Sequence, residues 1–200
     1  MAQFHRRNRE GENEFSTDSW DGYPASRARL LKHIYESKTN NAVVIGGDIH
    51  TYWANELKAN FDDPSSPTVA TEFIGTSVSS NPVTTNEVVA PFLSNNPHVK
   101  YFESRKRGYV MAEITRDQLT ARFRAISDVT DPNATVDTLK TFIVESGKPG
   151  PHVMINAVTH GNEICGAIVV DKLLRQGLRP RRGTLTLSFA NVDAFFRFDP

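Results

Sequence analysis

The sequence is poor in cysteine, in long apolar runs and in net charge, and each shortage excludes a class of protein. One cysteine among 200 residues, Cys165, excludes an intrachain disulfide framework. No stretch reaches the roughly 18 apolar residues of a membrane span, and the N-terminus lacks the apolar core of a secretory signal. We therefore expect no membrane partner and, for the chain as written, a cytoplasmic location.

Acidic and basic residues balance, so neither sign of charge dominates. The 23 Lys and Arg residues and the 23 Asp and Glu residues give a formal net charge of zero. A general nucleic-acid binder needs a strongly basic patch, and the densest basic runs, 5–9 and 179–182, are short. We therefore expect no nucleic-acid partner.

The first three quarters of the chain have the pattern of an α/β protein. Residues 1–19 are polar and show no apolar period, so we expect a loop-like segment there. Pro24 and an apolar stripe at helical spacing predict an amphipathic helix that ends before Asn40. The unbroken run 42–45 predicts a strand buried on both faces. Further strands are predicted at 68–74, 99–102, 109–114 and 119–126.

A stretch rich in Pro and Gly, 147–151, is the best candidate for a domain boundary. Beyond it the pattern predicts a strand at 153–158, a helix at 164–174 and a strand at 184–189. Such a crossover makes two parallel neighbours in a sheet. The predicted organisation is a polar segment 1–19, a first domain 20–146, a linker 147–151 and a second unit 152–200.

An acid and an imidazole follow the predicted strand 42–45 directly. Asp48 and His50 stand after Gly46 and Gly47, so both side chains emerge at the carboxyl end of this strand. Ligands collect at that end of α/β sheets, and the pair offers a hard oxygen donor and a nitrogen donor or proton carrier. The alternative is structural, with Asp48 as a cap and His50 as a satisfied loop residue.

The surroundings of this pair resemble the alkaline phosphatase D family over about residues 4–149. The resemblance is carried, in the family's order, by DSWDGYP (18–24), GDIHTYWANEL (47–57), FDDP (61–64), EFIGTS (72–77), NPHVK (96–100) and RGYV (107–110).

This resemblance implies a calcium- and iron-dependent phosphomonoesterase or phosphodiesterase, normally exported, that acts on a small phosphoester. Its fold would be part of a metallophosphoesterase-like core of sheets flanked by helices. By position, Asp48 would be a calcium ligand and Tyr109 the phenolate ligand of the iron. His50 would be the catalytic residue, facing the phosphate or completing the metal shell. Without the family, Tyr109 is a half-buried packing residue, and we expect His98 at the surface.

A second candidate site follows the Pro- and Gly-rich stretch. His160 and Glu163 stand between a predicted strand and a predicted helix, at a spacing that lets both converge on one ion. Zinc accepts two His and one Glu with water, whereas the alternative is a Glu that caps the helix near a surface His. The surrounding motif, GPHVMINAVTHGNE at 150–163, resembles the beginning of the succinylglutamate desuccinylase/aspartoacylase family over about residues 149–200.

The second resemblance implies the first strand, helix and strand of a zinc-carboxypeptidase-like α/β domain. His160 and Glu163 would be zinc ligands, and the substrate would be an N-acyl amino acid.

Both candidate sites lack ligands that their families use. Asp48 and its neighbours cannot supply the about six to eight oxygens of a calcium ion, and two ligands bind zinc weakly. We therefore expect a fragment of a metal-dependent phosphatase or phosphodiesterase that is inactive alone. The alternatives are a zinc-dependent N-acyl-amino-acid amidohydrolase and a noncatalytic product of gene fusion, decay or assembly error.

Overall fold

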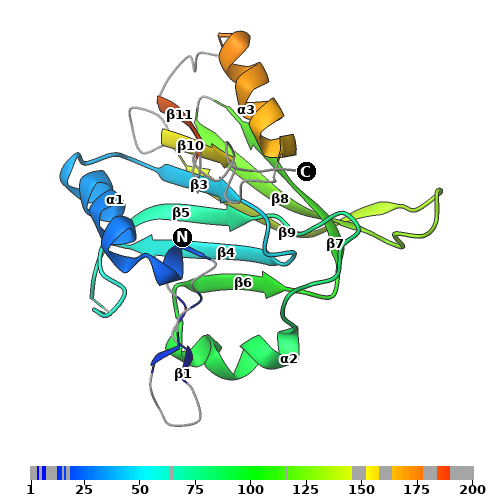
Figure 1. Cartoon of the computed structure of the whole chain (residues 1–200), viewed down its shortest axis with the longest axis horizontal. Coiled ribbons are helices and arrows are strands. Elements are labelled where there is room, and N and C mark those ends of the chain that lie inside the picture. The colour runs from blue at the N-terminus through cyan, green and yellow to red at the C-terminus, as the bar shows by residue number, and fades with distance from the viewer. Residues whose placement is uncertain are drawn as a thin grey trace.

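The structure, a computed structural model, consists of two packed sheets with helices around them (Figure 1). It describes residues 4, 6–7, 13–14, 16, 19–63, 65–115, 117–145, 152–157, 164–177 and 184–189. The helices are η1 (Trp20–Gly22), α1 (Pro24–Glu36), α2 (Asn86–Val89), η2 (Ala90–Asn95) and α3 (Ile164–Arg175). None of the described helices is long and apolar enough to span a bilayer.

The larger sheet has six strands in the order β11-β10-β3-β5-β4-β6. Their bounds are β3 (Ala42–Gly46), β4 (Tyr52–Lys58), β5 (Thr68–Ile74), β6 (Val99–Glu103), β10 (His152–Ala157) and β11 (Thr184–Phe189). β3 pairs in parallel with both β5 and β10, whereas β4 runs antiparallel to β5 and β6. The predicted burial of β3 is confirmed, since Ala42, Val43 and Val44 are all buried.

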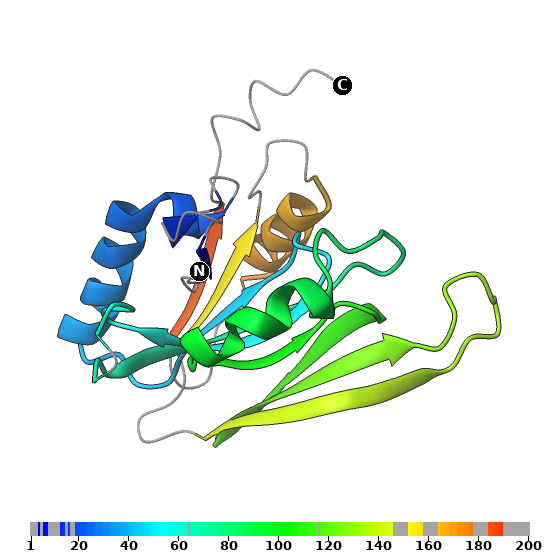
Figure 2. The same cartoon turned by 90° about the horizontal axis from the view of Figure 1, so that it is seen from below.

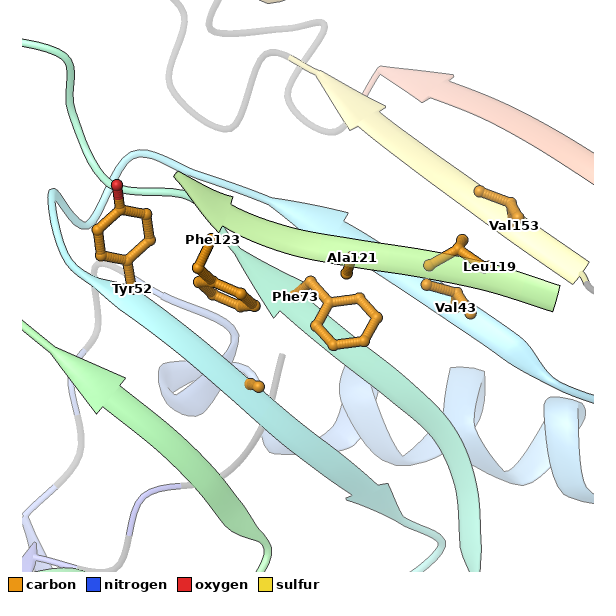
Figure 3. Packing of buried hydrophobic residues seen from close by; sticks show 8 residues of the cluster. Val43, Tyr52, Phe73, Leu119, Ala121, Phe123 and Val153 are labelled. Atoms are coloured by element: carbon orange, nitrogen blue, oxygen red, sulfur yellow. The ribbon is translucent and has the colours of Figure 1, made fainter. Parts of the chain in front are cut away.

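The smaller sheet is an antiparallel meander of β7 (Arg107–Ile114), β8 (Gln118–Ile126) and β9 (Val136–Glu145). Leu119, Ala121 and Phe123 alternate along β8 and are fully buried, as the sequence pattern predicts. They pack against the central sheet, where Val43 and Phe73 complete the same cluster (Figure 3). This contact is the main hydrophobic core. β1 (Arg6–Arg7) and β2 (Asn13–Glu14) pair only with each other, as an antiparallel two-stranded sheet.

Helix α1 covers the opposite face of the central sheet (Figure 2). Pro24 occupies its first turn, where the missing N–H costs no helical hydrogen bond. Leu31 is fully buried against Ala42, Val44 and Ala70. Because side chains alternate along a strand, Val43 and Val44 serve opposite faces of one sheet.

Residues beyond 151 extend the central sheet. β10 and β11 are parallel neighbours, which confirms the prediction for the strands on either side of the 164–174 helix. Val170 of α3 packs on Ile155 and Leu187, and Ile155 also contacts the core beneath the smaller sheet. α3 therefore lies on the same face as that sheet. The mixed α/β fold is confirmed, whereas the zinc-carboxypeptidase-like character of the second unit and the boundary at 147–151 stay predictions.

Candidate functional site

Three chain segments meet at the carboxyl ends of β3 and β5. The Gly75 N–H donates to the Gly46 carbonyl at 2.9 Å, which joins the two strand ends. The Gly108 N–H donates to the Ser77 carbonyl at 3.1 Å, which attaches the start of β7 to the segment after β5. The turn that carries Asp48 and His50 and the start of the strand that carries Tyr109 therefore lie at the same end of the central sheet.

Asp48 and His50 lie in an unusual backbone turn. Their φ angles are 76° and 55°, in the left-handed region that residues other than glycine rarely adopt. Each such residue costs on the order of 1–2 kcal/mol, so surrounding contacts must hold the turn. Asp48 is exposed and His50 is half-buried, so the turn presents both side chains at the surface of the strand ends.

One hydrogen bond fixes the His50 imidazole. Its Nδ1 lies 2.8 Å from the Asn81 carbonyl oxygen. Because a carbonyl oxygen can only accept, Nδ1 carries the hydrogen, and Nε2 keeps the lone pair in the neutral ring. His50 therefore offers Nε2 as the atom that takes up or gives a proton.

Tyr109 lies on the outer face of β7. Val110, its neighbour, packs on the hydrophobic core, so alternation along the strand points Tyr109 away from the core. Its side chain is 42% exposed. Its backbone N–H bonds to the hydroxyl of Tyr52, which itself donates to the Arg124 carbonyl at 2.6 Å. Burial raises the pKa of Tyr52, so this hydroxyl stays protonated as a structural donor.

Arg107 was not among the residues that the sequence singled out for chemistry. Its guanidinium donates to the carbonyls of His50 at 2.9 Å and Ser80 at 2.8 Å, and to the carbonyl of Ser104. Partial burial lowers the pKa of Arg107. The only signal in the sequence is its place beside Gly108 and Tyr109 in the RGYV motif.

The described residues do not complete a metal site. Among them, no group of three or more His, Cys, Asp or Glu side chains is placed to hold an ion. Asp48 supplies a hard oxygen and Tyr109 a phenol, which suit calcium and ferric iron in kind, but calcium needs about six to eight oxygens. The donors fit such metals in chemistry and fall short in number.

The second predicted site lies outside the described residues. His160 and Glu163 both belong to the stretch 158–163, between β10 and α3. Their role as zinc ligands stays a prediction.

A hollow of about 420 Å³ lies at the opposite end of the central sheet from Asp48. It is bordered by the end of α1, by the segment between α1 and β3, which includes Asn41, and by the first residues of β5, which include Thr68. Because parallel strands begin there, it is separate from the candidate site at their carboxyl ends.

A protein-family model matches more than half of the chain. This model, described as PhoD-like phosphatase, matches residues 1–123. The chain belongs to this family.

Two relatives make the comparison specific. Alkaline phosphatase D of Bacillus subtilis (strain 168) is 38% identical over 138 residues, which cover 68% of this chain and 24% of the relative. A solved structure described as "Structure of PhoD" matches with a TM-score of 0.65 and 29% identity, covering 98% of this chain and 33% of that one. The chain thus spans about a quarter of the length of the curated relative, whereas the likeness in fold extends over nearly all of the chain.

Proposed function

We infer that the chain carries part of a phosphoester-hydrolysing site, with Asp48, His50 and Tyr109 as its contribution. The observation that supports this most directly is that the turn with Asp48 and His50 and the strand with Tyr109 are both attached to the segment after β5, in a chain that belongs to the PhoD-like phosphatases. Ligands of α/β sheets bind at the carboxyl ends of the strands.

Each of the three residues has a distinct role in this proposal. Asp48 offers a carboxylate oxygen to calcium, and Tyr109 offers its phenol oxygen to ferric iron. His50, with Nδ1 held by Asn81, presents Nε2 to a phosphate oxygen. When bound, the metals would neutralise charge on the phosphoryl group and activate water.

The chain is not expected to turn over substrate by itself. Asp48, His50 and Tyr109 are too few to form the coordination shell of calcium, and no larger donor group occurs among the described residues. We therefore expect hydrolysis of an aryl phosphate to stay at the level of the metal-only blank. Turnover above that blank would contradict the proposed incompleteness.

Ferric iron provides the direct test, because a phenolate bound to Fe(III) absorbs visible light. We expect a charge-transfer band when Fe(III) is added to the chain, and we expect Tyr109→Phe to abolish it. Tyr35→Phe is the matched control, since Tyr35 is 55% exposed on α1. Calorimetry with inorganic phosphate, in the presence of calcium and iron, should show binding that Asp48→Asn and His50→Gln weaken. Absence of both the band and phosphate binding would overturn the proposal.

The resemblance of residues 149–200 to zinc-dependent amidohydrolases remains a separate prediction. Release of succinate from N-succinylglutamate in the presence of zinc, lost in Glu163→Gln, would establish it.

A further inference from the structure

We propose that Arg107 is the positioning residue of the candidate site, fastening three separate segments to one guanidinium. This rests on the proposed function, because it concerns how the His50 side chain is held at that site. Arg107 itself lies at the start of β7, two residues before Tyr109.

The three acceptors come from three different parts of the chain. One is the His50 carbonyl, at the end of the turn with positive φ angles. The second is the Ser80 carbonyl, in the segment after β5. The third is the Ser104 carbonyl, which directly follows β6. His50 and Ser80 lie far from Arg107 in sequence, whereas Ser104 lies three residues before it, so Arg107 cross-links two distant segments to the connection between β6 and β7.

Most of the hydrogen-bond donors of Arg107 are used on main-chain carbonyls. One terminal nitrogen donates to both His50 and Ser80, so its two hydrogens are in use. The other terminal nitrogen donates to Ser104. Arg107 therefore commits three of its five N–H groups to main-chain carbonyls, so most of its donors hold the segments around the site.

Two hydrogen bonds, one to the main chain of His50 and one to its ring, hold the imidazole in place. Arg107 holds the main-chain carbonyl of His50, and the Asn81 carbonyl holds the ring at Nδ1. Ser80 and Asn81 are consecutive, so the same guanidinium also fixes the segment that provides the ring's acceptor. These bonds oppose the conformational cost of the left-handed turn.

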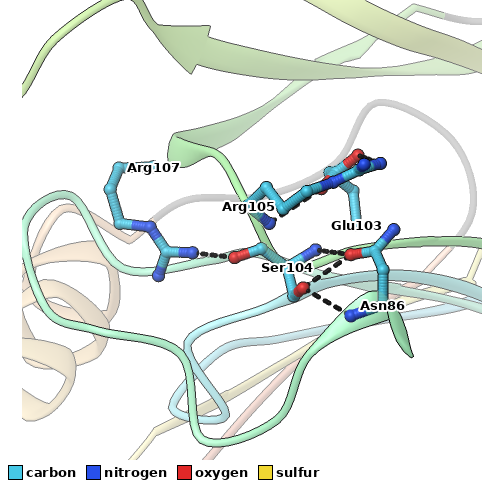
Figure 4. Close-up of polar contacts among 5 residues, drawn as sticks. All are labelled: Asn86, Glu103, Ser104, Arg105 and Arg107. Carbon is cyan, nitrogen blue, oxygen red and sulfur yellow. Dashed lines mark hydrogen bonds and ion pairs between the residues drawn. The ribbon is translucent and has the colours of Figure 1, made fainter. Parts of the chain in front are cut away.

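The third acceptor residue, Ser104, is itself held by hydrogen bonds to Asn86 (Figure 4). Ser104 is 1% exposed. Its N–H donates to the Asn86 side-chain oxygen at 2.8 Å, and its hydroxyl accepts from the Asn86 N–H at 2.9 Å. Asn86 is the first residue of α2. Arg107 thus ties the carbonyls of His50 and Ser80 to a point that contacts both α2 and β6.

Arg105 is a matched control on the same stretch of chain. It carries the same charge two residues earlier, but it is exposed and pairs with Glu103, pointing away from Arg107 in Figure 4. Replacing it removes a cation without removing any bond to the three segments.

Hydrogen exchange on the full chain, free of metal and phosphate, tests the proposal. We expect Arg107→Met to speed amide exchange by about tenfold or more at 47–52 and 77–82, with β8 unchanged, because only the local anchor is lost. Arg105→Met should leave all segments as in the wild type. Arg107→Lys should restore protection in part, since an ammonium lacks the planar fork that reaches three carbonyls.

Three outcomes would overturn the proposal. The first is wild-type exchange at both segments in Arg107→Met, and the second is a uniform increase that includes β8. The third is full restoration by Arg107→Lys, which would mean that one point charge suffices. Phosphate calorimetry adds a readout of the site, with about tenfold weaker binding expected in Arg107→Met. If the wild type binds no phosphate, the proposed function fails, while the exchange result still decides the role of Arg107.

Discussion

The two faces of the central sheet are built on different principles. Toward the smaller sheet, Phe123 contacts Tyr52, Phe73, Tyr101 and Phe142 at ring-centroid distances of 5.2 to 6.1 Å. Toward α1, the buried contacts include an ion pair and a bond from the Asn55 amide to the Glu72 carboxylate at 2.9 Å. The first face is packed by aromatic rings, whereas the second combines the apolar contacts of Leu31 with paired polar groups. Single substitutions on the two faces should therefore lower the free energy of unfolding for different reasons.

The largest effect is expected at the centre of the aromatic face. Phe123→Ala should lower the free energy of unfolding by about 4 kcal/mol, because it removes the ring that four others contact and leaves a cavity. Urea unfolding followed by fluorescence measures the change. Tyr35→Ala, on the exposed side of α1, should change it by less than about 0.5 kcal/mol. A loss below about 1 kcal/mol for Phe123→Ala would mean that the cluster repacks freely.

The helix face should show a loss that a second substitution repairs. Arg27 and Asp21 form an ion pair at 2.9 Å with side chains only 4% and 8% exposed. Asp21→Ala should cost about 3 kcal/mol, because it removes the carboxylate that accepts from the buried Arg27 guanidinium, and Asp21→Ala with Arg27→Met should recover part of that loss.

The exposed pair of Lys32 and Glu36 is the control for this experiment. Glu36→Ala should change the free energy of unfolding by less than about 0.5 kcal/mol. Equal losses in the single and double variants at Asp21 and Arg27 would show that the pair does not act as a unit.

A backbone contact on the aromatic face should have an intermediate effect. Gly108 has a φ of 151°, and a Cβ at this position would collide with the Arg124 carbonyl oxygen. Gly108→Ala should therefore cost about 2 kcal/mol. Gly177 also has a positive φ, 61°, but has open space around it, so Gly177→Ala should cost only about 1 kcal/mol. Thermal unfolding of both variants compares the collision with the conformational cost alone.

The smallest effect should depend on pH. Tyr52→Phe removes the bond to the Arg124 carbonyl and should cost about 1 kcal/mol near pH 7. Burial raises the pKa of Tyr52 above its ordinary value of about 10. The stability that this group contributes is therefore present below pH ~10 and is lost as pH rises further, because the unfolded chain ionises first. Urea midpoints between pH 7 and 11 should converge for wild type and Tyr52→Phe, whereas parallel curves would contradict this assignment.

The sequence pattern was most informative where one period dominated. The helix after Pro24, the doubly buried run of β3 and the alternation of β8 are all as predicted. β4 was missed as a strand because residues 52–57 are apolar or polar without alternation, and four consecutive positions, Tyr52 to Asn55, are buried. His98, expected at the surface between Pro97 and Val99, is 4% exposed and packs edge-on to Phe61 at 5.0 Å. Tertiary contacts, which no local pattern carries, decide both cases.

The candidate site was predictable only in part for a similar reason. Asp48 and His50 follow a recognisable strand end, so their neighbourhood can be read from the sequence. Arg107 forms hydrogen bonds to His50 and Ser80, which precede it by 57 and 27 positions in sequence. No local sequence pattern predicts contacts over such separations. The positive φ angles of Asp48 and His50 carry no signal either, since glycine is absent from both positions.

The pairing of β3 with β10 also sets the order in which the protein can be assembled. Ala42 pairs with His152, a partner made 110 residues later in the chain (152 minus 42). At typical rates of synthesis this interval is on the order of ten seconds, during which one edge of β3 has no neighbour. Such long-range parallel pairing is intrinsically slow, and an unpaired edge invites association with other chains. The strand that leads into Asp48 and His50 therefore gains its second neighbour only after the smaller sheet, β7 to β9, has been synthesised.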